Sequence, residues 1–151
     1  MKIEFEIPIQ KLFSECIHQS MVDAQGVVTE SGQSMVGEVA LSEKNREIFE
    51  IELASQVSRL YTAFTDLLQC KESNDSGLVF SVATPDIDSP SFAQAVAIAV
   101  KDYLKYAMLV WWNLSRGNTM LLTAYSARQD EVRSNLLHLI TPQEVRPYRY
   151  W

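Results

Sequence analysis

The residues of this sequence that could support catalysis or bind a metal are few and widely spaced. The two histidines are His18 and His138, and they lie far apart in the chain. Glu15 stands three positions before His18, so the two side chains could share one face of a helix. Zinc requires further cysteine, histidine or carboxylate ligands, and none is nearby in the sequence. We therefore predict that His18 is a helix-surface residue rather than a metal ligand.

The cysteines and the loop carboxylates also lack the setting of a reactive site. Cys16 falls on the apolar stripe of a predicted helix, which favours a buried thiol over a disulfide or a ligand and implies a reducing compartment. Asp86 and Asp88, in the segment TPDIDSP, are better interpreted as turn formers before a helix than as paired acids. The chain contains no GxSxG elbow and no phosphate-binding glycine loop. We expect a protein that is not an enzyme and holds neither a metal nor a cofactor.

The composition is that of one globular domain. The chain has 151 residues, of which 47% are hydrophobic and 21% charged. A net charge of −6 argues against a general nucleic-acid binder, and the acidic start MKIEFEIP is unlike an export signal. The most apolar segment, Phe92 to Trp112, is interrupted by Lys101, Asp102 and Lys105, which predicts a buried helix rather than a membrane span.

Hydrophobic periodicity predicts a mainly α fold with four main helices. Ser42 can cap the second helix, Pro90 can occupy the first position of the third, and SRGN separates the third from the fourth. The predicted ranges are 8–22, 42–70, 90–116 and 119–140. The buried face expected for the second helix consists of Ile48, Ile51, Val57, Leu60, Tyr61, Phe64, Leu67 and Leu68.

The remaining segments predict a minor sheet, a long connection and a tail. Residues 2–7 and 78–83 alternate apolar and polar side chains, so they predict two short strands that can pair. The connection over residues 23–41 contains three glycines and no sustained period. Both an arm that contacts a partner and a plain flexible loop fit it. Residues 142–151 should form an extended tail, because Pro147 keeps the residue before it out of the helical region.

Charge is unevenly distributed along the chain. Residues 1–90 contain 6 basic and 15 acidic side chains, a balance of −9, whereas residues 91–151 contain 7 and 4, a balance of +3. A protein with this asymmetry can associate head to tail with further copies of itself. The alternative is that each half simply has a solvated charged surface.

Aromatic residues suggest where such contacts would form. Trp111 and Trp112 are adjacent, so their side chains point about 100° apart on a helix, and a small domain can hardly bury both. One of them is expected to face a partner or the C-terminal tail. Tryptophan, tyrosine and arginine often anchor protein interfaces. The predicted partner interface therefore consists of Trp111, Trp112, Arg146, Tyr148, Arg149, Tyr150 and Trp151. Folding of the tail back onto the third helix is the intramolecular alternative.

Four segments resemble small virion proteins encoded in the structural gene blocks of tailed phages and prophages of gut Bacteroidetes. These segments are IEFEIPIQKLFSEC, DYLKYAMLVWWNL, ARQDEVRSNLL and the closing RPYRYW. The resemblance covers about half of the chain and implies a head–tail connector or tail-completion protein. Such a protein would assemble in the host cytoplasm, form a homo-oligomeric ring in the virion and contact portal or tail subunits.

The expected function is thus that of a structural subunit without a membrane span or sequence-specific nucleic-acid binding. The alternative hypothesis is a cytoplasmic helical binding module, which would hold a small apolar ligand or a peptide between the third and fourth helices.

Overall fold

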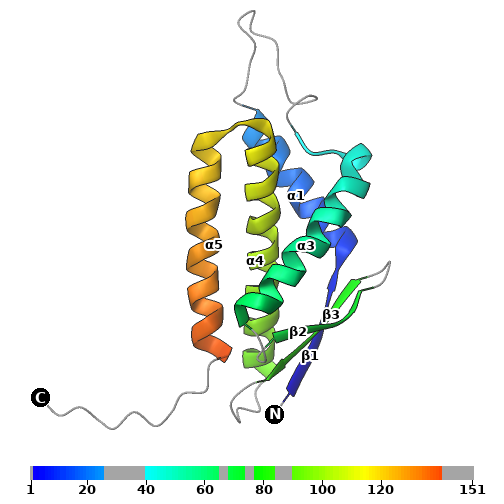
Figure 1. Cartoon of the computed structure of the whole chain (residues 1–151), viewed down its shortest axis with the longest axis vertical. Helices are drawn as coiled ribbons and strands as arrows, with labels where there is room; N and C mark the ends of the chain where they lie inside the picture. Colours follow the sequence, from blue (N-terminus) through cyan, green and yellow to red (C-terminus); the bar gives the residue numbers. More distant parts are fainter. Residues whose placement is uncertain (1, 26–39, 65–67, 74–76, 84–89, 141–151) are drawn as a thin grey trace, which may run out of the picture.

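The computed structural model of the chain describes residues 2–25, 40–64, 68–73, 77–83 and 90–140. It confirms the predicted fold class, which is mainly α with a minor antiparallel sheet (Figure 1). The predicted 23–41 connection and 142–151 tail fall largely or wholly outside the described residues. The elements, in chain order, are β1 (Lys2–Pro8), α1 (Ile9–Ala24), the 3-10 turn η1 (Glu43–Asn45), α3 (Arg46–Phe64), β2 (Leu68–Ser73), β3 (Gly77–Ala83), α4 (Pro90–Arg116) and α5 (Thr119–Ile140).

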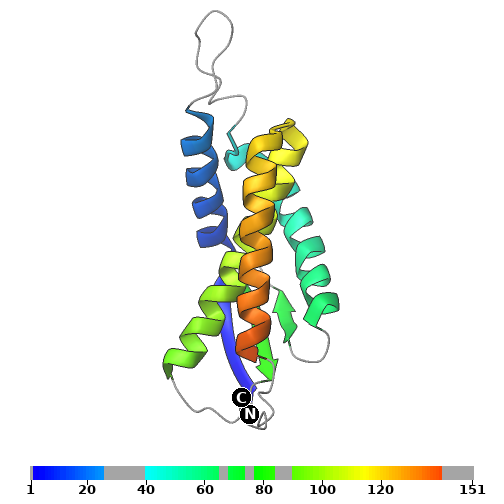
Figure 2. The same cartoon turned by 90° about the vertical axis from the view of Figure 1, so that its left-hand side faces the viewer.

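Helix α4 occupies the centre of the molecule. It packs along α5, and it also contacts α1, α3 and β1. Figure 2 shows α1 and α3 on opposite sides of it, with α5 in front. Its residues Val96, Val100 and Leu104 are fully buried, as are Met108 and Leu109 nearer its end. The apolar segment that was predicted to be a buried helix therefore forms the core around which the other elements pack.

The sheet has three strands in the order β1-β3-β2, and both pairings are antiparallel. Phe5 lies opposite Phe80, and their ring centroids are 5.6 Å apart. The predicted pairing of residues 2–7 with 78–83 is confirmed. One outer strand, β2, was not expected.

The predicted extension of the second helix to about residue 70 is wrong, because α3 ends at Phe64 and Leu68–Ser73 forms β2. Leu68 lies opposite Val82 and is buried, and Cys70 lies opposite Phe80. These side chains therefore extend the apolar face of the sheet. Pairing with β3 satisfies the backbone of this segment, as a helical turn would, and it also places Leu68 in the core opposite Val82.

The buried face of α3 also differs from the expected one. Ile48, Ile51 and Tyr61 are exposed, whereas Leu60 and Phe64 are buried as predicted. The buried face consists of Phe49, Leu53, Gln56, Leu60 and Phe64. Two apolar stripes exist on this helix, and the neighbouring elements cover the one that contains Phe49, whose ring centroid lies 4.7 Å from that of Phe13 on α1.

Candidate partner interface at the α4–α5 junction

The junction between α4 and α5 is a two-residue turn fixed by backbone hydrogen bonds. Gly117 has a φ of 72°, the left-handed conformation that ends many helices. The amide of Asn118 donates to the carbonyl of Asn113 (3.0 Å), and the amide of Gly117 donates to that of Leu114 (3.2 Å). The side chain of Asn118 then caps α5 by accepting from the amide of Leu121 at 3.2 Å. The turn therefore holds the last residues of α4 in fixed positions.

The two adjacent tryptophans near the end of α4 have different environments. Trp112 is only 4% exposed, and the guanidinium of Arg116 lies 4.2 Å from its ring centroid. Trp111 is half-buried against the core, and its ring centroid is 5.8 Å from that of Trp112. The expectation that Trp112 belongs to a partner surface is therefore corrected: its ring is buried in the core, and the guanidinium of Arg116 lies over it. Trp111 is the member of the pair that keeps a solvent-exposed edge.

The end of α1 is fastened to this region by a polar contact. The hydroxyl of Tyr125 on α5 donates to one carboxylate oxygen of Asp23, and the other oxygen accepts from the side-chain amide of Gln19 at 2.9 Å. Burial raises the pKa of Tyr125 above its ordinary value, and the hydrogen bond and negative charge of Asp23 raise it further. The ring of Tyr125 also stacks on that of Tyr106, with centroids 6.1 Å apart. Three helices are thus linked at one end of the molecule.

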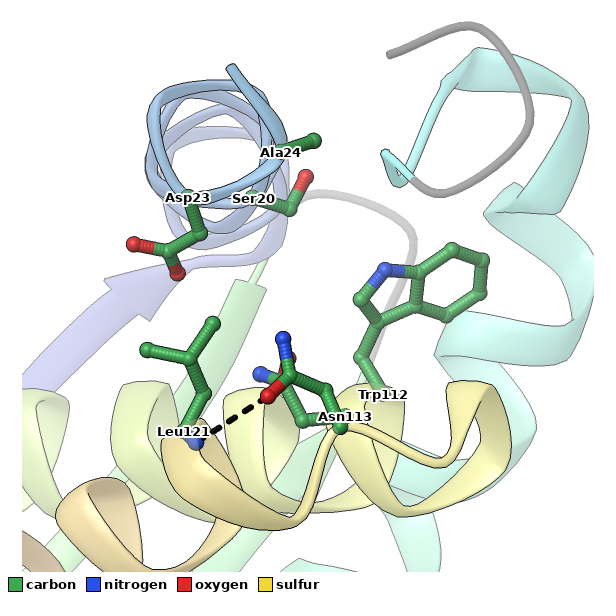
Figure 3. Close-up of a pocket in the computed structure, with 7 residues that line it drawn as sticks. Ser20, Asp23, Ala24, Trp112, Asn113 and Leu121 are labelled. Atoms are coloured by element: carbon green, nitrogen blue, oxygen red, sulfur yellow. Dashed lines mark hydrogen bonds between the residues drawn. The ribbon is translucent and has the colours of Figure 1, made fainter. Parts of the chain in front are cut away.

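A small cavity lies between the end of α1 and the α4–α5 turn (Figure 3). It has a volume of about 10 Å³, close to the minimum that holds one water molecule. In Figure 3, Ser20, Asp23 and Ala24 come from α1 and face Asn113 and Leu121 across this space. The complete lining is Ser20, Asp23, Ala24, Trp112, Asn113, Asn118 and Leu121. A cavity of this size can hold a structural water but not an organic ligand.

Large apolar side chains are exposed around the same end of the molecule. Leu114 and Met120, on either side of the α4–α5 turn, are 64% and 80% exposed. Met21 and Val22, in the last turns of α1, are also exposed. These residues lie on the helix ends that the Asp23–Tyr125 contact holds together. The arrangement can bind an apolar surface of another molecule, because little further ordering of the backbone is required.

The histidines, Cys16 and the loop aspartates are the side chains that could have supported catalysis or bound a metal. His18 is exposed on α1, as predicted, and His138 is exposed on α5. Cys16 is a free and buried thiol, also as predicted, and burial raises its pKa to about 12. Such a thiol is protonated at neutral pH and is a poor nucleophile. Asp86 and Asp88 lie outside the described residues.

The part of the chain that the structure describes contains neither a candidate metal site nor a candidate membrane span. Within these residues, no group of three or more histidine, cysteine or acidic side chains could hold a metal ion. None of the helices in the described ranges is long and apolar enough to cross a bilayer.

Most of the predicted interface residues fall in the tail. Arg146, Tyr148, Arg149, Tyr150 and Trp151 lie outside the described residues, so their role stays a prediction. Sequence reasoning also missed two features of the junction. The Asn118 cap had a readable signal, an asparagine directly after a glycine and before an apolar period. The Asp23–Tyr125 contact had none, because it joins residues about a hundred positions apart.

Comparison with known proteins adds no relative: the chain matches no family model, no curated protein and no solved structure.

Proposed function

We propose that the chain is a non-enzymatic structural subunit of a tailed-phage virion, at the head–tail connector or tail-completion position. Copies would assemble into a ring and contact portal or tail subunits. The observation that carries the proposal is the exposed apolar surface at the α4–α5 end, with Leu114, Met120, Met21 and Val22 as its members. Several large apolar side chains around one rigid end are typical of a surface that another protein covers.

The charge distribution supports assembly from identical copies. The acidic part of the chain includes Glu4 and Glu6 on β1 and Glu43, Glu47 and Glu50 on η1 and α3, all of which are exposed. The basic part includes the tail arginines Arg146 and Arg149. An extended tail with these arginines and three aromatic side chains is suited to bind an acidic surface of a neighbouring copy.

The resemblance to small virion proteins also supports the proposal. Three of its segments correspond to described elements: IEFEIPIQKLFSEC to β1 and α1, DYLKYAMLVWWNL to α4, and ARQDEVRSNLL to α5. These are the elements that make the core and the α4–α5 end. Of the four residues of the exposed apolar surface, Leu114 lies within these segments, at the end of DYLKYAMLVWWNL.

The alternative, a helical module that binds a small ligand between α4 and α5, has less support. The cavity at their junction is about 10 Å³, whereas pockets for drug-sized ligands have volumes of about 300 to 1,000 Å³. Binding there would require α4 and α5 to separate.

The proposal is tested on virions and on the purified chain. Mass spectrometry of virions from a host that carries the gene should detect the chain, and antibody labelling should place it at the head–tail junction by electron microscopy. An abundant cytosolic host protein serves as the contamination control. The purified full chain should form ring-shaped particles, and removal of residues 146–151 should prevent ring formation while the helical circular dichroism is retained. Absence from virions, or binding of a small ligand by a monomer, would refute the proposal.

A further inference from the structure

The outward face of α3 carries an uncharged stripe along its length. Its members are Ile48, Ile51, Ser55, Ser58 and Thr62, whose alternating spacing of three and four residues defines the a and d positions of a heptad repeat. Ile48 and Ile51 are 56% and 67% exposed. We call these five residues the α3 seam.

The seam lies opposite the face that α3 uses within its own chain. That inner face, from Phe49 to Phe64, packs against α4 and β2. In Figure 2, α3 lies at the margin of the molecule, with α4 on its inner side. The outward face of a solvated helix is normally polar or charged, so exposed isoleucines at consecutive a and d positions indicate a surface that another helix covers.

The second half of the seam is made of small residues that tolerate burial. The hydroxyl of Thr62 donates to the carbonyl of Ser58 at 3.1 Å, so its proton is already used within the helix. Ser55 and Ser58 are small enough to let another helix approach closely. Large residues therefore occupy the first half of the seam and small ones the second half.

This size gradient suits two antiparallel copies of α3. When one copy is reversed about a two-fold axis near Ser55, Ile48 lies beside Thr62 of the second copy, and Ile51 lies beside Ser58. Each isoleucine then faces a smaller side chain at the two ends of the contact, and only the central layer pairs serine with serine, at Ser55. A parallel pair would place isoleucine against isoleucine and serine against serine, which leaves the serine layers loosely packed.

The charges beside the seam favour the same orientation. Glu52 and Arg59 occupy the e positions, and reversal of one helix brings the e side of one copy against the e side of the other. Two Glu52–Arg59 ion pairs then form by symmetry. A parallel pair would instead bring Glu47 of one copy near Glu52 of the other, which is repulsive. Glu52 accepts a hydrogen bond from Gln56 at 2.9 Å with one oxygen, and Arg59 has no salt bridge among the described residues.

We propose that two copies of this chain associate through the α3 seam as a two-fold symmetric, antiparallel helix pair. Such a contact uses the same surface on both copies and is therefore closed. It does not extend into a ring, so it goes beyond the proposed virion function and does not depend on it. A dimer that is absent from virions would refute the proposed function alone. A virion ring whose subunits show no seam-dependent dimer in solution would refute this inference alone.

The first experiment measures the mass of the purified full chain by sedimentation equilibrium over a range of concentrations. At concentrations too low for ring formation, we expect the first association step of the unchanged chain to be a dimer, and we expect at least a tenfold weaker dimer for Ile51→Glu, which places a charge in the seam. Ile98→Glu, a matched change of an exposed isoleucine on α4 outside both proposed surfaces, should leave the dimer constant unchanged. Circular dichroism shows whether each variant is folded. A monomeric unchanged chain, or equal effects of the two substitutions, would overturn the inference.

A charge-exchange series tests the orientation. Glu52→Arg places two arginines against each other in each e–e contact, and Arg59→Glu places two glutamates there, so each single change should weaken the dimer. The double variant, Glu52→Arg with Arg59→Glu, restores both pairs with exchanged signs and should recover most of the association. If the double variant is no tighter than the weaker single variant, the antiparallel pairing is wrong.

Discussion

Helices α4 and α3 both carry apolar side chains on more than one face, yet they differ in how many neighbours cover them. Other elements pack around α4 on several sides, so Val100, Leu104 and Met108 are buried. Helix α3 is covered on one side, and Ile48 and Ile51 remain exposed. The number of neighbours, rather than the apolar content of a stripe, decides which side chains enter the core. An apolar stripe without a neighbour in its own chain is available for another molecule.

The largest expected effect on the free energy of unfolding comes from truncation of a buried leucine on α4, compared with truncation of an exposed isoleucine on α3. Leu104→Ala removes a fully buried side chain from α4 and should lower the free energy of unfolding by about 3 kcal/mol, the transfer and cavity cost of such a change. Ile51→Ala removes an exposed side chain from α3 and should cost less than about 0.5 kcal/mol in the monomer. Urea unfolding at a concentration where the chain is monomeric measures both. Similar costs would show that α3 and α4 are covered alike.

The next effect concerns the end of α4. Gly117→Ala should destabilise the protein by about 1 kcal/mol, because a residue with a Cβ is strained at a φ of 72°. No atom lies within 4 Å of the added methyl group, so the cost comes from the backbone alone. Gly117→Asn is the control and should cost less, since asparagine tolerates this conformation better. Thermal unfolding of both variants tests the difference, and an equal loss would indicate a steric cause.

The third effect is a pH dependence at the α1–α5 contact. The pKa of Tyr125 is raised in the folded chain, so the folded state holds this proton more tightly than the unfolded state. The resulting stability is complete below the ordinary tyrosine pKa of about 10 and is lost as pH rises above it. Tyr125→Phe should therefore show a smaller loss of stability between pH 9 and pH 11 than the unchanged chain. Tyr61→Phe, on the exposed side of α3, should keep the full alkaline loss, and identical profiles for all three proteins would contradict the assignment.

The smallest expected effect compares two ion pairs. Lys101 on α4 contacts Glu15 on α1 at 2.9 Å, and Arg46 contacts Glu50 on α3 at 3.0 Å. The first pair joins two helices and is less exposed, so Lys101→Met should cost up to about 1 kcal/mol, against about 0.3 to 0.5 kcal/mol for Glu50→Gln. Unfolding measured at low and high salt separates these charge effects from packing. A larger cost on α3 would reverse the order expected from their exposure.

Local signals in the sequence were sufficient to predict the bounds of those elements that begin and end at recognisable residues. The predicted ranges 90–116 and 119–140 agree with α4 and α5, because Pro90 begins the first and Gly117 with Asn118 separates the two. The pairing of β1 with β3 was also predictable, since both segments alternate with a period of two.

Features that depend on distant residues could not be predicted in the same way. Strand β2 exists because β3 is available to pair with it, and no local signal distinguished Leu68–Ser73 from the end of a helix. The inner face of α3 was ambiguous, because its sequence contains two apolar stripes and only the neighbouring elements select one. Trp112 was placed on a surface for the same reason: the sequence does not reveal which of the two adjacent tryptophan rings the core buries.

The two-residue turn between α4 and α5 also has a consequence for the order of folding. Residues of these helices meet after the closure of a very short loop, whereas about half of the chain lies between Phe5 and its partner Phe80. Closing the longer loop costs more conformational entropy before any contact compensates for it. We therefore expect the α4–α5 hairpin to form early and β1 to join the sheet late. During synthesis, β1 would leave the ribosome first yet wait unpaired until β3 has emerged.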